Sequence, residues 1–582
     1  MKSQLRARIR TFPFATLICG LLLILPPISL LCYIRVFGVN VIFWDDWENV
    51  PLYQQLMSGK LAFSDLFAQH NEHRMLFPNI VMLAIENLTR YNTVSVMFFS
   101  WLLICAAGLL VFCVYQKQFR WGSHSEFLLF FLPVMLLYGF RQWESILWAI
   151  TNQIYLMILG VVATFFLLEI SKKTDIWFVL CILGSILASF SFLAGLAVWP
   201  IGLLQIVISE RRKMLQDAAL WCSASATVFI SYFWGYVKPA HHPSLSYVLT
   251  EPLKAVEFFF TILGAPFSSD NVAIAEALGI VVALTSALIV VQLYREKLLR
   301  KNRIWLSLVL FTTLFSLIIT VGRCGFGVEQ ALSSRYTPIT ILGVIGLYFL
   351  ALSVFKKLLA RGKSFGAYAL LSLVLVGVIV IYGVGCYAGW PAGQQTKYSR
   401  EMGAYILRTY RIQSDENIRN YLYPSPAIVR ERAAFLEKNG LNVFCEPVIN
   451  ISILLPRDST FFAIETINSI AIPEQPSTLV IHLGQIETVT ITGWAVDKQA
   501  NDVASTVFII IDDKNIVPVF YGIDRPDVAN NFGNTNFRAS GYIATFSFSV
   551  LGKGVHSISL KIVSKDRHYY YDQGQVLSLI VD

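Results

Sequence analysis

Charged residues are scarce in this chain. Asp, Glu, Lys and Arg make up 14% of its 582 residues, whereas 55% are hydrophobic. Ordinary soluble domains carry about a quarter charged residues. The shortage is concentrated in residues 1–390, which hold nearly all of the long apolar runs. This distribution excludes an ordinary soluble protein and predicts a polytopic membrane protein with a water-soluble C-terminal extension.

Cysteine motifs and internal repeats are also missing. The nine cysteines form no CxxC or His-Cys pattern, so no zinc site is indicated. Cys324, Cys386 and Cys445 leave room for one disulfide, which their spacing does not identify. The first apolar run is too long for a signal peptide, and no small-residue cleavage site follows it. We therefore expect it to be a retained helix.

Long apolar runs are abundant. About 20 apolar residues cross a bilayer, and eleven runs approach or exceed that length, those at Phe127, Ile176 and Leu193 being the shortest. We expect residues 253–266 to form a re-entrant or interfacial helix. The eleven runs are Phe12–Phe37, Val94–Tyr115, Phe127–Phe140, Ile150–Ile170, Ile176–Phe190, Leu193–Ile208, Ala218–Val237, Val272–Tyr294, Ile304–Val321, Pro338–Phe355 and Phe365–Ala388.

Basic residues mark every second loop. They precede the first run and follow the second, fourth, sixth, eighth and tenth, which predicts a cytoplasmic N-terminus. An odd number of spans then places the C-terminal domain and the loop after the first span outside. The net charge of +9 mainly reflects this topology and does not indicate nucleic-acid binding.

The pattern changes after residue 390. Residues 391–455 are polar with helix-like patches, which predicts a helical juxtamembrane linker. From residue 456 the hydrophobic period becomes two, which predicts an antiparallel β-sandwich over residues 456–582. The expected strands are Thr478–Leu483, Val489–Val496, Val507–Ile511, Val517–Ile523, Ile543–Val550, His556–Val563 and Val576–Val581.

An acidic pair, Asp45 and Asp46, lies between Trp44 and Trp47 just after the first span. One explanation is structural: the two carboxylates would be solvated loop residues beside a belt of tryptophans at the membrane interface. The first outer loop, residues 38–93, is nevertheless far longer than a typical connection. A positioned carboxylate can remove a proton from a reacting hydroxyl. On an extended segment the two side chains would point apart, and Asp46 is the first choice because it adjoins Trp47, a candidate sugar platform.

A second polar cluster in the same loop runs from His70 through Glu72 and His73 to Arg74. Side chains of these types can bind phosphate, sugar hydroxyls or a metal ion. On a helix, His70 and His73 would share one face, and a metal would need a third ligand, for which Asp45 is a candidate. The alternative is polar capping of a helix over residues 74–88.

Four arginines are expected at the outer face. The planar guanidinium suits phosphate, whereas interfacial snorkelling is an equal alternative for Arg141 and Arg323. Arg335 is the stronger candidate, because it precedes a span within the glycine-containing loop 322–336, with Tyr336 beside it. The four are Arg74, Arg141, Arg323 and Arg335.

A long first outer loop that begins with an acidic pair resembles the GT-C superfamily, whose members are polytopic glycosyltransferases that use polyprenyl-phosphate-linked sugars. Three further segments resemble those of a group of bacterial membrane glycosyltransferases: Gln69–Arg74; Arg141–Ser145 with Trp148 and Gln153; and Gly325–Gly327 with Ser334–Tyr336. The resemblance implies a mainly α transmembrane bundle as the catalytic domain, residues 1–390, in a bacterial cytoplasmic membrane.

The resemblance also implies a reaction. A sugar would pass from polyprenyl phosphate to a glycan, glycolipid or protein acceptor on the outer face, with inversion and with Asp46 or Asp45 as the base. No cofactor is implied, apart from the open question of a divalent metal. The lipid phosphate would be bound by Arg335, Arg74, Arg141, Arg323 and His73, and the substrates by Trp44, Trp47, His70, Glu72 and Tyr336.

Other functions remain alternatives. A lipid-linked sugar transporter would be expected to show internal repeats and ionisable residues at midspan, and neither is clear in this sequence. A non-catalytic envelope scaffold would serve to present the β-domain. An O-antigen polymerase or ligase would use outer-loop arginines but would not need the acidic pair.

The C-terminal region carries segments that resemble an accessory sandwich module of bacterial envelope glycosyltransferases: residues 493–497, 521–528 and 540–542. Trp494 and Tyr542 either stack on sugar rings or, more commonly for single aromatics on strands, belong to the core. Asp524, Arg525 and Asp527 form either a structural turn network or a calcium site.

Overall fold

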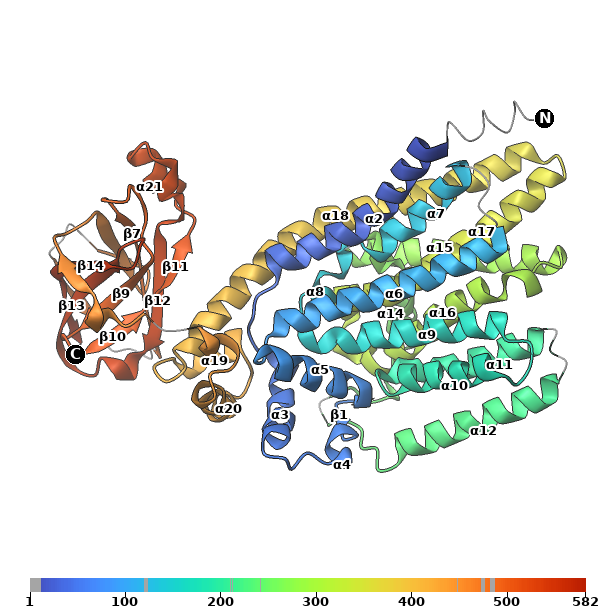
Figure 1. Cartoon of the computed structure of the whole chain (residues 1–582), viewed down its shortest axis with the longest axis horizontal. Coiled ribbons are helices and arrows are strands. Elements are labelled where there is room, and N and C mark those ends of the chain that lie inside the picture. The colour runs from blue at the N-terminus through green and yellow to red at the C-terminus, as the bar shows by residue number, and fades with distance from the viewer. Residues whose placement is uncertain are drawn as a thin grey trace. The chain divides into compact units, whose positions relative to one another are not determined.

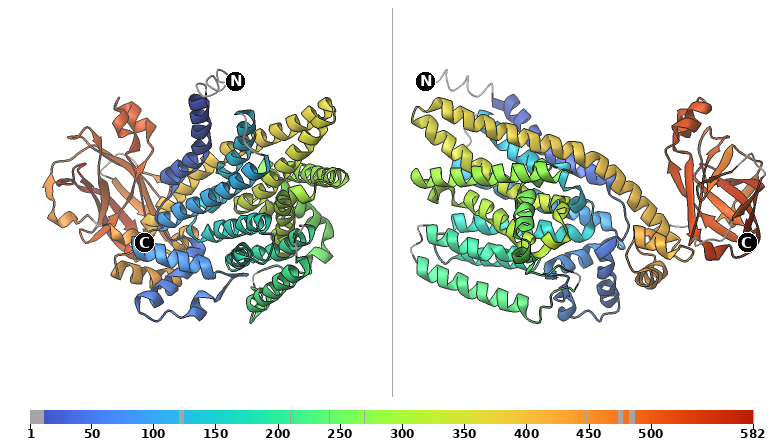
Figure 2. Two further views of the ribbon diagram at one scale, coloured as in Figure 1. Left: turned by 45° about the vertical axis from the view of Figure 1, so that its right-hand side comes forward. Right: turned by 180° about the vertical axis from the view of Figure 1, so that it is seen from behind.

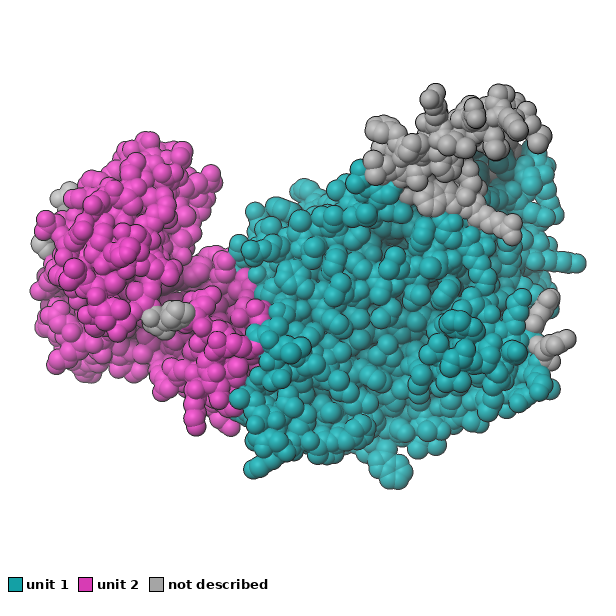
Figure 3. Space-filling view, in the orientation of Figure 1, with its two compact units in different colours: residues 1–38, 52–89, 93–397 teal, residues 39–51, 90–92, 398–582 magenta. Residues whose placement is uncertain are grey.

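The computed structural model describes residues 12–119, 124–209, 211, 213–240, 242–268, 270–446, 449–472, 477–481 and 487–581. The chain divides into two compact units (Figure 3). Unit 1 comprises residues 1–38, 52–89 and 93–397, and unit 2 comprises residues 39–51, 90–92 and 398–582. Each unit is described by itself.

Unit 1 is a helical bundle, and its long helices run roughly along a common direction (Figures 1 and 2). Each of the eleven predicted apolar runs overlaps one of its helices. The longer helices are α2 (Phe12–Phe37), α5 (Leu76–Thr89), α6 (Thr93–Phe119), α7 (His124–Leu137), α9 (Asn152–Ile170), α10 (Ile176–Ser189), α11 (Val198–Ile208), α12 (Met214–Phe233), α14 (Pro252–Gly264), α15 (Val272–Arg295), α16 (Arg303–Arg323), α17 (Thr337–Ala360) and α18 (Ser364–Arg408).

Seven helices within the described residues are long and apolar enough to cross a membrane: α2, α6, α9, α15, α16, α17 and α18. The remaining predicted crossings fall mainly on shorter helices, such as α10 and α11, or on α12. The predicted total of about eleven crossings therefore stays a prediction, whereas a mainly α, multi-helix membrane fold is confirmed.

Glycines let α14 and α15 pack backbone against backbone. A Cβ added at Gly264 would lie 1.8 Å from the carbonyl oxygen of Ala275, and one added at Gly279 would lie 1.8 Å from that of Phe260. Neither carbonyl belongs to a flexible side chain, so no larger residue fits at either position. Close approach through small residues is a typical way for helices to associate in a membrane.

Polar side chains join several helices at one end of the bundle. Gln118 donates to Asn302 over 2.7 Å, and Ser353 donates to the same Asn302 oxygen over 2.6 Å. Arg303 and Glu169 form an ion pair at 2.9 Å. These contacts connect the C-terminal ends of α6, α9 and α17 to the start of α16, and these are ends that the basic-loop pattern assigns to the cytoplasm.

Unit 2 contains two six-stranded sheets with one shared core (Figure 1). Buried Ile491 from one sheet and Ile509 and Leu560 from the other belong to the same cluster, which confirms the predicted sandwich. The pairing is not wholly antiparallel as predicted, because β14 pairs parallel with β3 and with β6. One sheet has the order β10-β9-β13-β14-β3 with β6 beside β14, and the other β11-β12-β7-β4-β5 with β8 beside β7. The strands are β3 (Leu455–Arg457), β4 (Phe462–Ile467), β5 (Ile470–Ala471), β6 (Ser477–Ile481), β7 (Thr488–Asp497), β8 (Asp502–Val503), β9 (Thr506–Ile511), β10 (Asn515–Pro518), β11 (Phe520–Ile523), β12 (Gly541–Ser547), β13 (Gly554–Val563) and β14 (Tyr569–Val581).

One expected strand, residues 517–523, is in fact two. The chain leaves one sheet at the end of β10 and enters the other at β11. Val517 and Val519 are both buried in the shared core, so the alternating pattern continues through the crossing. The strand β4 was not predicted, because a bulge between Ile464 and Thr466 interrupts its alternation.

Unit 2 also holds helices α19 (Asp415–Tyr421), α20 (Pro426–Lys438) and α21 (Pro526–Asn531). Two pieces of the first outer loop pack with this region. The side-chain amide of Asn442 donates to the side chain of Asn40 and to the carbonyl oxygen of Tyr91, both over 2.8 Å. One buried amide thus joins three segments that are distant in the sequence.

The strand β7 ends in a buried carboxylate. Asp497 is 1% exposed and accepts hydrogen bonds from the backbone N–H groups of Gln499, Ala500 and Lys565, at 3.1, 3.0 and 2.8 Å. It also accepts from the hydroxyl of Tyr571 over 2.5 Å. These contacts join the end of β7 to the β13–β14 connection and to β14.

We predict that Asp497→Asn destabilises the β-sandwich by about 3 kcal/mol, because an amide nitrogen would face a buried donor and leave it unsatisfied. Denaturant unfolding of the full chain, followed by a probe on the sandwich, measures the change. The exposed Asp458→Asn is the matched control and should leave the midpoint unchanged. Equal midpoints for the two variants would contradict the structural role.

Candidate functional site

The acidic pair lies on a short 3-10 helix, η1 (Trp44–Glu48), in unit 2. The expectation of an extended segment was wrong. Trp44 adopts a positive φ of 46°, and its N–H donates to the carbonyl oxygen of Leu422 over 2.8 Å. A 3-10 helix turns by about a third of a circle per residue, so neighbouring side chains face different surroundings. Asp46 is 2% exposed, whereas Asp45 is half-buried.

Glu48 fixes the C-terminal end of this turn. Its carboxylate accepts from the hydroxyl of Tyr423 over 2.8 Å and pairs with Arg432 at 3.2 Å. Arg432 also donates to the carbonyl oxygen of Trp47 over 2.5 Å. Burial, followed by the carboxylates of Glu48 and Asp45, raises the pKa of Tyr423 to about 12. The phenol therefore stays protonated and keeps donating to Glu48 at any physiological pH.

The two tryptophans beside the acids differ in accessibility. Trp47 is 0% exposed, so neither face of its ring is open, which contradicts its expected place as a sugar platform. Trp44 is 43% exposed and keeps an accessible ring. The guanidinium of Arg400 lies 3.0 Å from the centre of the Phe43 ring and covers the residue before the turn.

The second polar cluster forms a hairpin in unit 1. Strands β1 (Gln69–His70) and β2 (His73–Arg74) pair antiparallel, with His70 opposite His73. The expected shared helix face is therefore wrong, because Asn71, at φ 49°, turns the chain back on itself. The half-buried ring of His70 contacts the amide of Asn71 at 3.4 Å.

Arg74 holds the hairpin against the end of α12. Its Nε donates to the carbonyl oxygen of Tyr232 over 2.6 Å, its Nη1 donates to that of Phe67 over 3.0 Å, and its Nη2 donates to that of Trp234. The residue is 7% exposed. In this arrangement the guanidinium is engaged by the fold and is not presented to a phosphate.

Glu72, at the tip of the hairpin, is the centre of a charged cluster. Its carboxylate lies 3.5 Å from the Nε2 atoms of both His73 and His242 and pairs with Arg323. The Nδ1 of His73 accepts from the N–H of Leu193 over 3.2 Å, which directs its Nε2 toward Glu72. Burial tends to raise the pKa of Glu72, but His73 and Arg323 outweigh it and lower the pKa to about 2.

His242 was not among the site residues predicted from the sequence, because no spacing relates it to Glu72. Its side chain is 7% exposed and packs edge-on against Phe326, with ring centres 6.0 Å apart. Its neighbour His241 lies outside the described residues.

A second cluster in unit 1 forms around Glu144, on helix α8 (Trp143–Ile146). Its carboxylate accepts from the hydroxyls of Ser333 and Ser334, at 3.1 and 3.3 Å, and pairs with Arg335 at 3.0 Å. The Arg335 guanidinium lies 6.0 Å from the Trp148 ring centre. The segments around residues 141–148 and 333–336, which the sequence singled out separately, therefore lie together.

Arg141 lies at the edge of this second cluster. It is 3% exposed, and its Nη2 donates to the carbonyl oxygen of Leu332 over 2.7 Å. Its buried Nε has no hydrogen-bond partner among the described residues. Burial lowers the pKa of Arg141 to about 10, while Glu144 and Asp270 act in the opposite direction. The residue is still charged at neutral pH and retains an unused donor.

Both clusters involve the segment from Arg323 to Tyr336, which joins α16 to α17. Arg323, at its start, reaches the Glu72 cluster, and Arg335, near its end, reaches the Glu144 cluster. Tyr336 is 7% exposed and lies edge-on to Phe315 at 6.0 Å, so its ring belongs to the core. Asp45 and Asp46 belong to unit 2.

A metal site at the hairpin is not supported. Within the described ranges, no group of three or more His, Cys, Asp or Glu side chains could hold a metal ion. Cys324, Cys386 and Cys445 are all free thiols, so the disulfide considered among them is not formed.

The aromatic and charged residues singled out in the β-sandwich take part in its packing and its ion pairs. Tyr542 is 1% exposed and donates to the carbonyl oxygen of Ala463 over 3.1 Å, which places it in the core. Arg525 pairs with Glu465 and Asp527, both at 2.6 Å. Since an arginine already occupies these carboxylates, the structural alternative for the turn is favoured over calcium.

Comparison with known proteins finds limited likeness. No family model matches the chain. A protein of Archaeoglobus fulgidus described as uncharacterized is 27% identical over 247 residues, which cover 38% of this chain and 62% of that protein. This chain thus spans less than two thirds of that relative's length.

Two solved structures of ArnT from Cupriavidus metallidurans are similar to this chain. The apo structure has a TM-score of 0.37 at 13% identity and covers 71% of this chain and 87% of that chain. The structure bound to undecaprenyl phosphate has a TM-score of 0.40 at 11% identity and covers 72% and 88%. The function of this chain therefore has to be inferred from its own residues.

We predict that Glu72 stabilises unit 1 in a pH-dependent way. Because its pKa falls from 4.5 to about 2 on folding, its contribution is complete above pH 4.5 and is lost as the pH falls toward 2. It corresponds to at most about 3 kcal/mol. Glu72→Gln should lower the unfolding temperature at pH 5 and should lower it by less below pH 4.5.

Thermal unfolding of the full chain in detergent, scanned over pH, measures this difference. The matched control is Glu251→Gln, which removes an exposed carboxylate paired with Lys254 at 3.5 Å. The control should change little at any pH. A Glu72→Gln deficit that persists undiminished at pH 3 would contradict the assignment.

Proposed function

We propose that this chain is a GT-C-like membrane glycosyltransferase, which moves a sugar from a polyprenyl phosphate to an acceptor at the outer face of a bacterial cytoplasmic membrane. The observation that carries the proposal is the acidic turn Trp44–Glu48, which follows the first apolar helix and leaves Asp45 accessible between fixed neighbours. Contacts from Arg432, Tyr423 and Leu422 fix the residues on either side of the pair, which an ordinary surface loop would not need.

The chemistry requires one base. As the acceptor hydroxyl attacks the anomeric carbon, its proton passes to a carboxylate, the bond from that carbon to the phosphate oxygen breaks, and the configuration inverts. A base must come within about 3 Å of the hydroxyl. The exposure of the two acids supports Asp45 as the residue that meets the acceptor, with buried Asp46 shaping the turn. This reverses the order of preference drawn from the sequence.

The leaving lipid phosphate gains negative charge and needs cations around it. Arg335 suits this role, because its side chain stays 35% exposed while it pairs with Glu144 at 3.0 Å. Arg141 adds a buried charge with an unused Nε donor. Arg323, whose side chain is 26% exposed, offers a second polar contact for the substrates beside the buried His73 and Glu72. Arg74 positions the hairpin that carries His73 and Glu72.

We place both clusters on the outer side of the membrane. The support is the alternation of basic loops together with the contacts that gather Gln118, Asn302 and Arg303 at one end of the bundle. Arg323 and Arg335 lie at the opposite ends of α16 and α17. Arg323 is the last residue of α16, and Arg335 precedes the start of α17 at Thr337. The same class of lipid, undecaprenyl phosphate, is the ligand in one of the ArnT structures.

Asp45→Asn should abolish sugar transfer, with a loss of at least about 100-fold in kcat, because general-base catalysis contributes that much or more. The assay follows release of polyprenyl phosphate from a panel of polyprenyl-phosphate hexoses and pentoses by the purified protein in nanodiscs, with glycan, glycolipid and protein acceptors supplied. Asp65→Asn removes another carboxylate of the same loop and should retain activity.

The double variant of Asp45 and Asp46 completes the test. If it still transfers sugar at the wild-type rate, neither acid is the base and the proposed mechanism is excluded. If only Asp46→Asn is inactive while its unfolding temperature is unchanged, Asp46 rather than Asp45 is the base.

Arg335→Gln should weaken use of the lipid donor. Loss of a charge-assisted contact to phosphate costs about 1.5–3 kcal/mol, or roughly 10- to 100-fold in kcat/KM. Arg361→Gln removes an arginine paired with a glutamate, Glu296, in another part of the bundle and serves as the control. Equal donor kinetics for the two variants would remove Arg335 from the phosphate site.

A further inference from the structure

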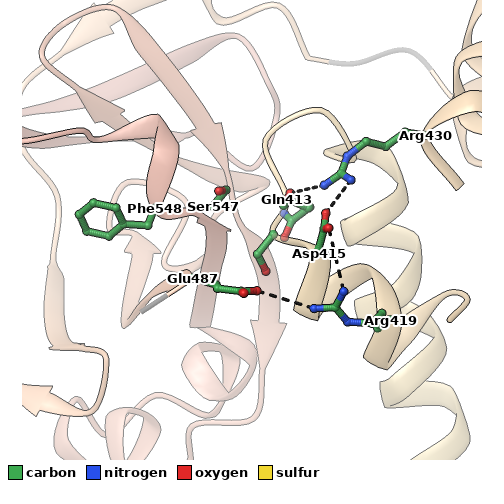
Figure 4. Close-up of a pocket in the computed structure, with 8 residues that line it drawn as sticks. Gln413, Asp415, Arg419, Arg430, Glu487, Ser547 and Phe548 are labelled. Atoms are coloured by element: carbon green, nitrogen blue, oxygen red, sulfur yellow. Dashed lines mark hydrogen bonds and ion pairs between the residues drawn. The ribbon is translucent and has the colours of Figure 1, made fainter. Parts of the chain in front are cut away.

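A pocket of about 320 Å³ opens within unit 2 (Figure 4). It lies where the segment leading into α19 meets α20 and the ends of two strands of the sandwich. Its lining is polar apart from one phenylalanine, whose ring points away from the charged side chains in Figure 4. The lining residues are Gln413, Ser414, Asp415, Arg419, Arg430, Glu487, Ser547 and Phe548.

Acidic and basic side chains alternate along the pocket. Glu487 lies 3.7 Å from Arg419, Arg419 lies 4.0 Å from Asp415, and Asp415 lies 2.6 Å from Arg430 (Figure 4). The four formal charges sum to zero. A phosphate or a carboxylate ligand would have to displace one of the two acids, so the pocket is not arranged for an anion.

Arg419 is the least constrained member of this series. Its two ion-pair contacts are longer than hydrogen bonds, which lie near 2.7–3.2 Å, and within the described residues its guanidinium makes no hydrogen bond. Its side chain is 46% exposed. Arg430, in contrast, also donates to the carbonyl oxygen of Gln413 over 3.1 Å. Arg419 therefore offers its N–H groups to a ligand.

The base of the pocket is fixed. Gln413 is 2% exposed and donates to the hydroxyl of Thr409 and to the carbonyl oxygen of Thr545, both over 2.7 Å. Ser414 is 3% exposed and shares a hydrogen bond of 2.6 Å with the hydroxyl of Thr488. Because these groups are already satisfied, the rigid base positions the charged side chains above it.

We propose that this pocket binds a neutral, polyhydroxylated ligand, namely a short stretch of glycan. A sugar hydroxyl both donates and accepts, so neighbouring hydroxyls can accept from Arg419 while donating to Asp415 or Glu487. The volume lies at the lower end of the range for ligand pockets, about 300–1,000 Å³. This pocket is separate from the proposed transfer site. Binding to it is measured without sugar transfer, so the glycan-binding proposal and the proposed function can be disproved independently.

The test uses the full chain in nanodiscs and saturation-transfer NMR. The neutral probes are cellotetraose, chitotetraose and mannotetraose, and the anionic probes are tetragalacturonate and inorganic phosphate. At least one neutral probe should bind, and Arg419→Gln should weaken it by about tenfold or more, the cost of one charged hydrogen bond. Glu487→Gln should weaken the same probe. The control, Arg411→Gln, removes an exposed arginine paired with Glu437 at 2.7 Å and should bind as the wild type does.

Three results would overturn the proposal. One is the absence of binding by every neutral probe at millimolar concentration. Another is preferential binding of tetragalacturonate or phosphate. The third is a neutral probe whose affinity is unchanged in both Arg419→Gln and Glu487→Gln, provided that unfolding temperatures confirm that the variants fold.

Discussion

A carboxylate that is withdrawn from water must be given cations or hydrogen-bond donors, and this requirement organises both units. Glu72 draws Arg323 and two histidines around the tip of a hairpin, and Glu144 draws Arg335 and two serines. Glu48, although 35% exposed, is held in the same way by Arg432 and Tyr423. Each carboxylate thereby joins segments that are far apart in the sequence, and each cluster leaves a more exposed charged group beside it.

Identical residue types have different roles in this fold because of the acceptors nearest to them. Arg74 meets three backbone carbonyl oxygens and becomes part of the scaffold. Arg335 meets one carboxylate and keeps a third of its side chain in solvent. The two tryptophans beside the acidic pair differ similarly, since Trp47 is buried and Trp44 is not. Residue type and position in the sequence were therefore not sufficient to tell a buried structural arginine or tryptophan from an accessible one.

The sequence predicted those features that depend on local composition. The long apolar helices and the sandwich were both found, because membrane crossing and sheet burial each impose a pattern within a single segment. The 3-10 turn at residues 44–48 and the hairpin at residues 69–74 were not, because contacts with Leu422 and Tyr232 stabilise them. The inclusion of His242 in the Glu72 cluster likewise depends on tertiary packing, which no spacing in the sequence reveals.

The acidic turn also has a consequence for biogenesis. Its partners Leu422, Tyr423 and Arg432 are synthesised more than three hundred residues after it, and Asn442 later still fixes the loop through Asn40 and Tyr91. A nascent chain that has inserted its first helices therefore exposes Asp45 and Asp46 without the residues that shape them. The turn acquires these contacts only after residue 442 has been synthesised, which couples the maturation of this site to a late stage of translation.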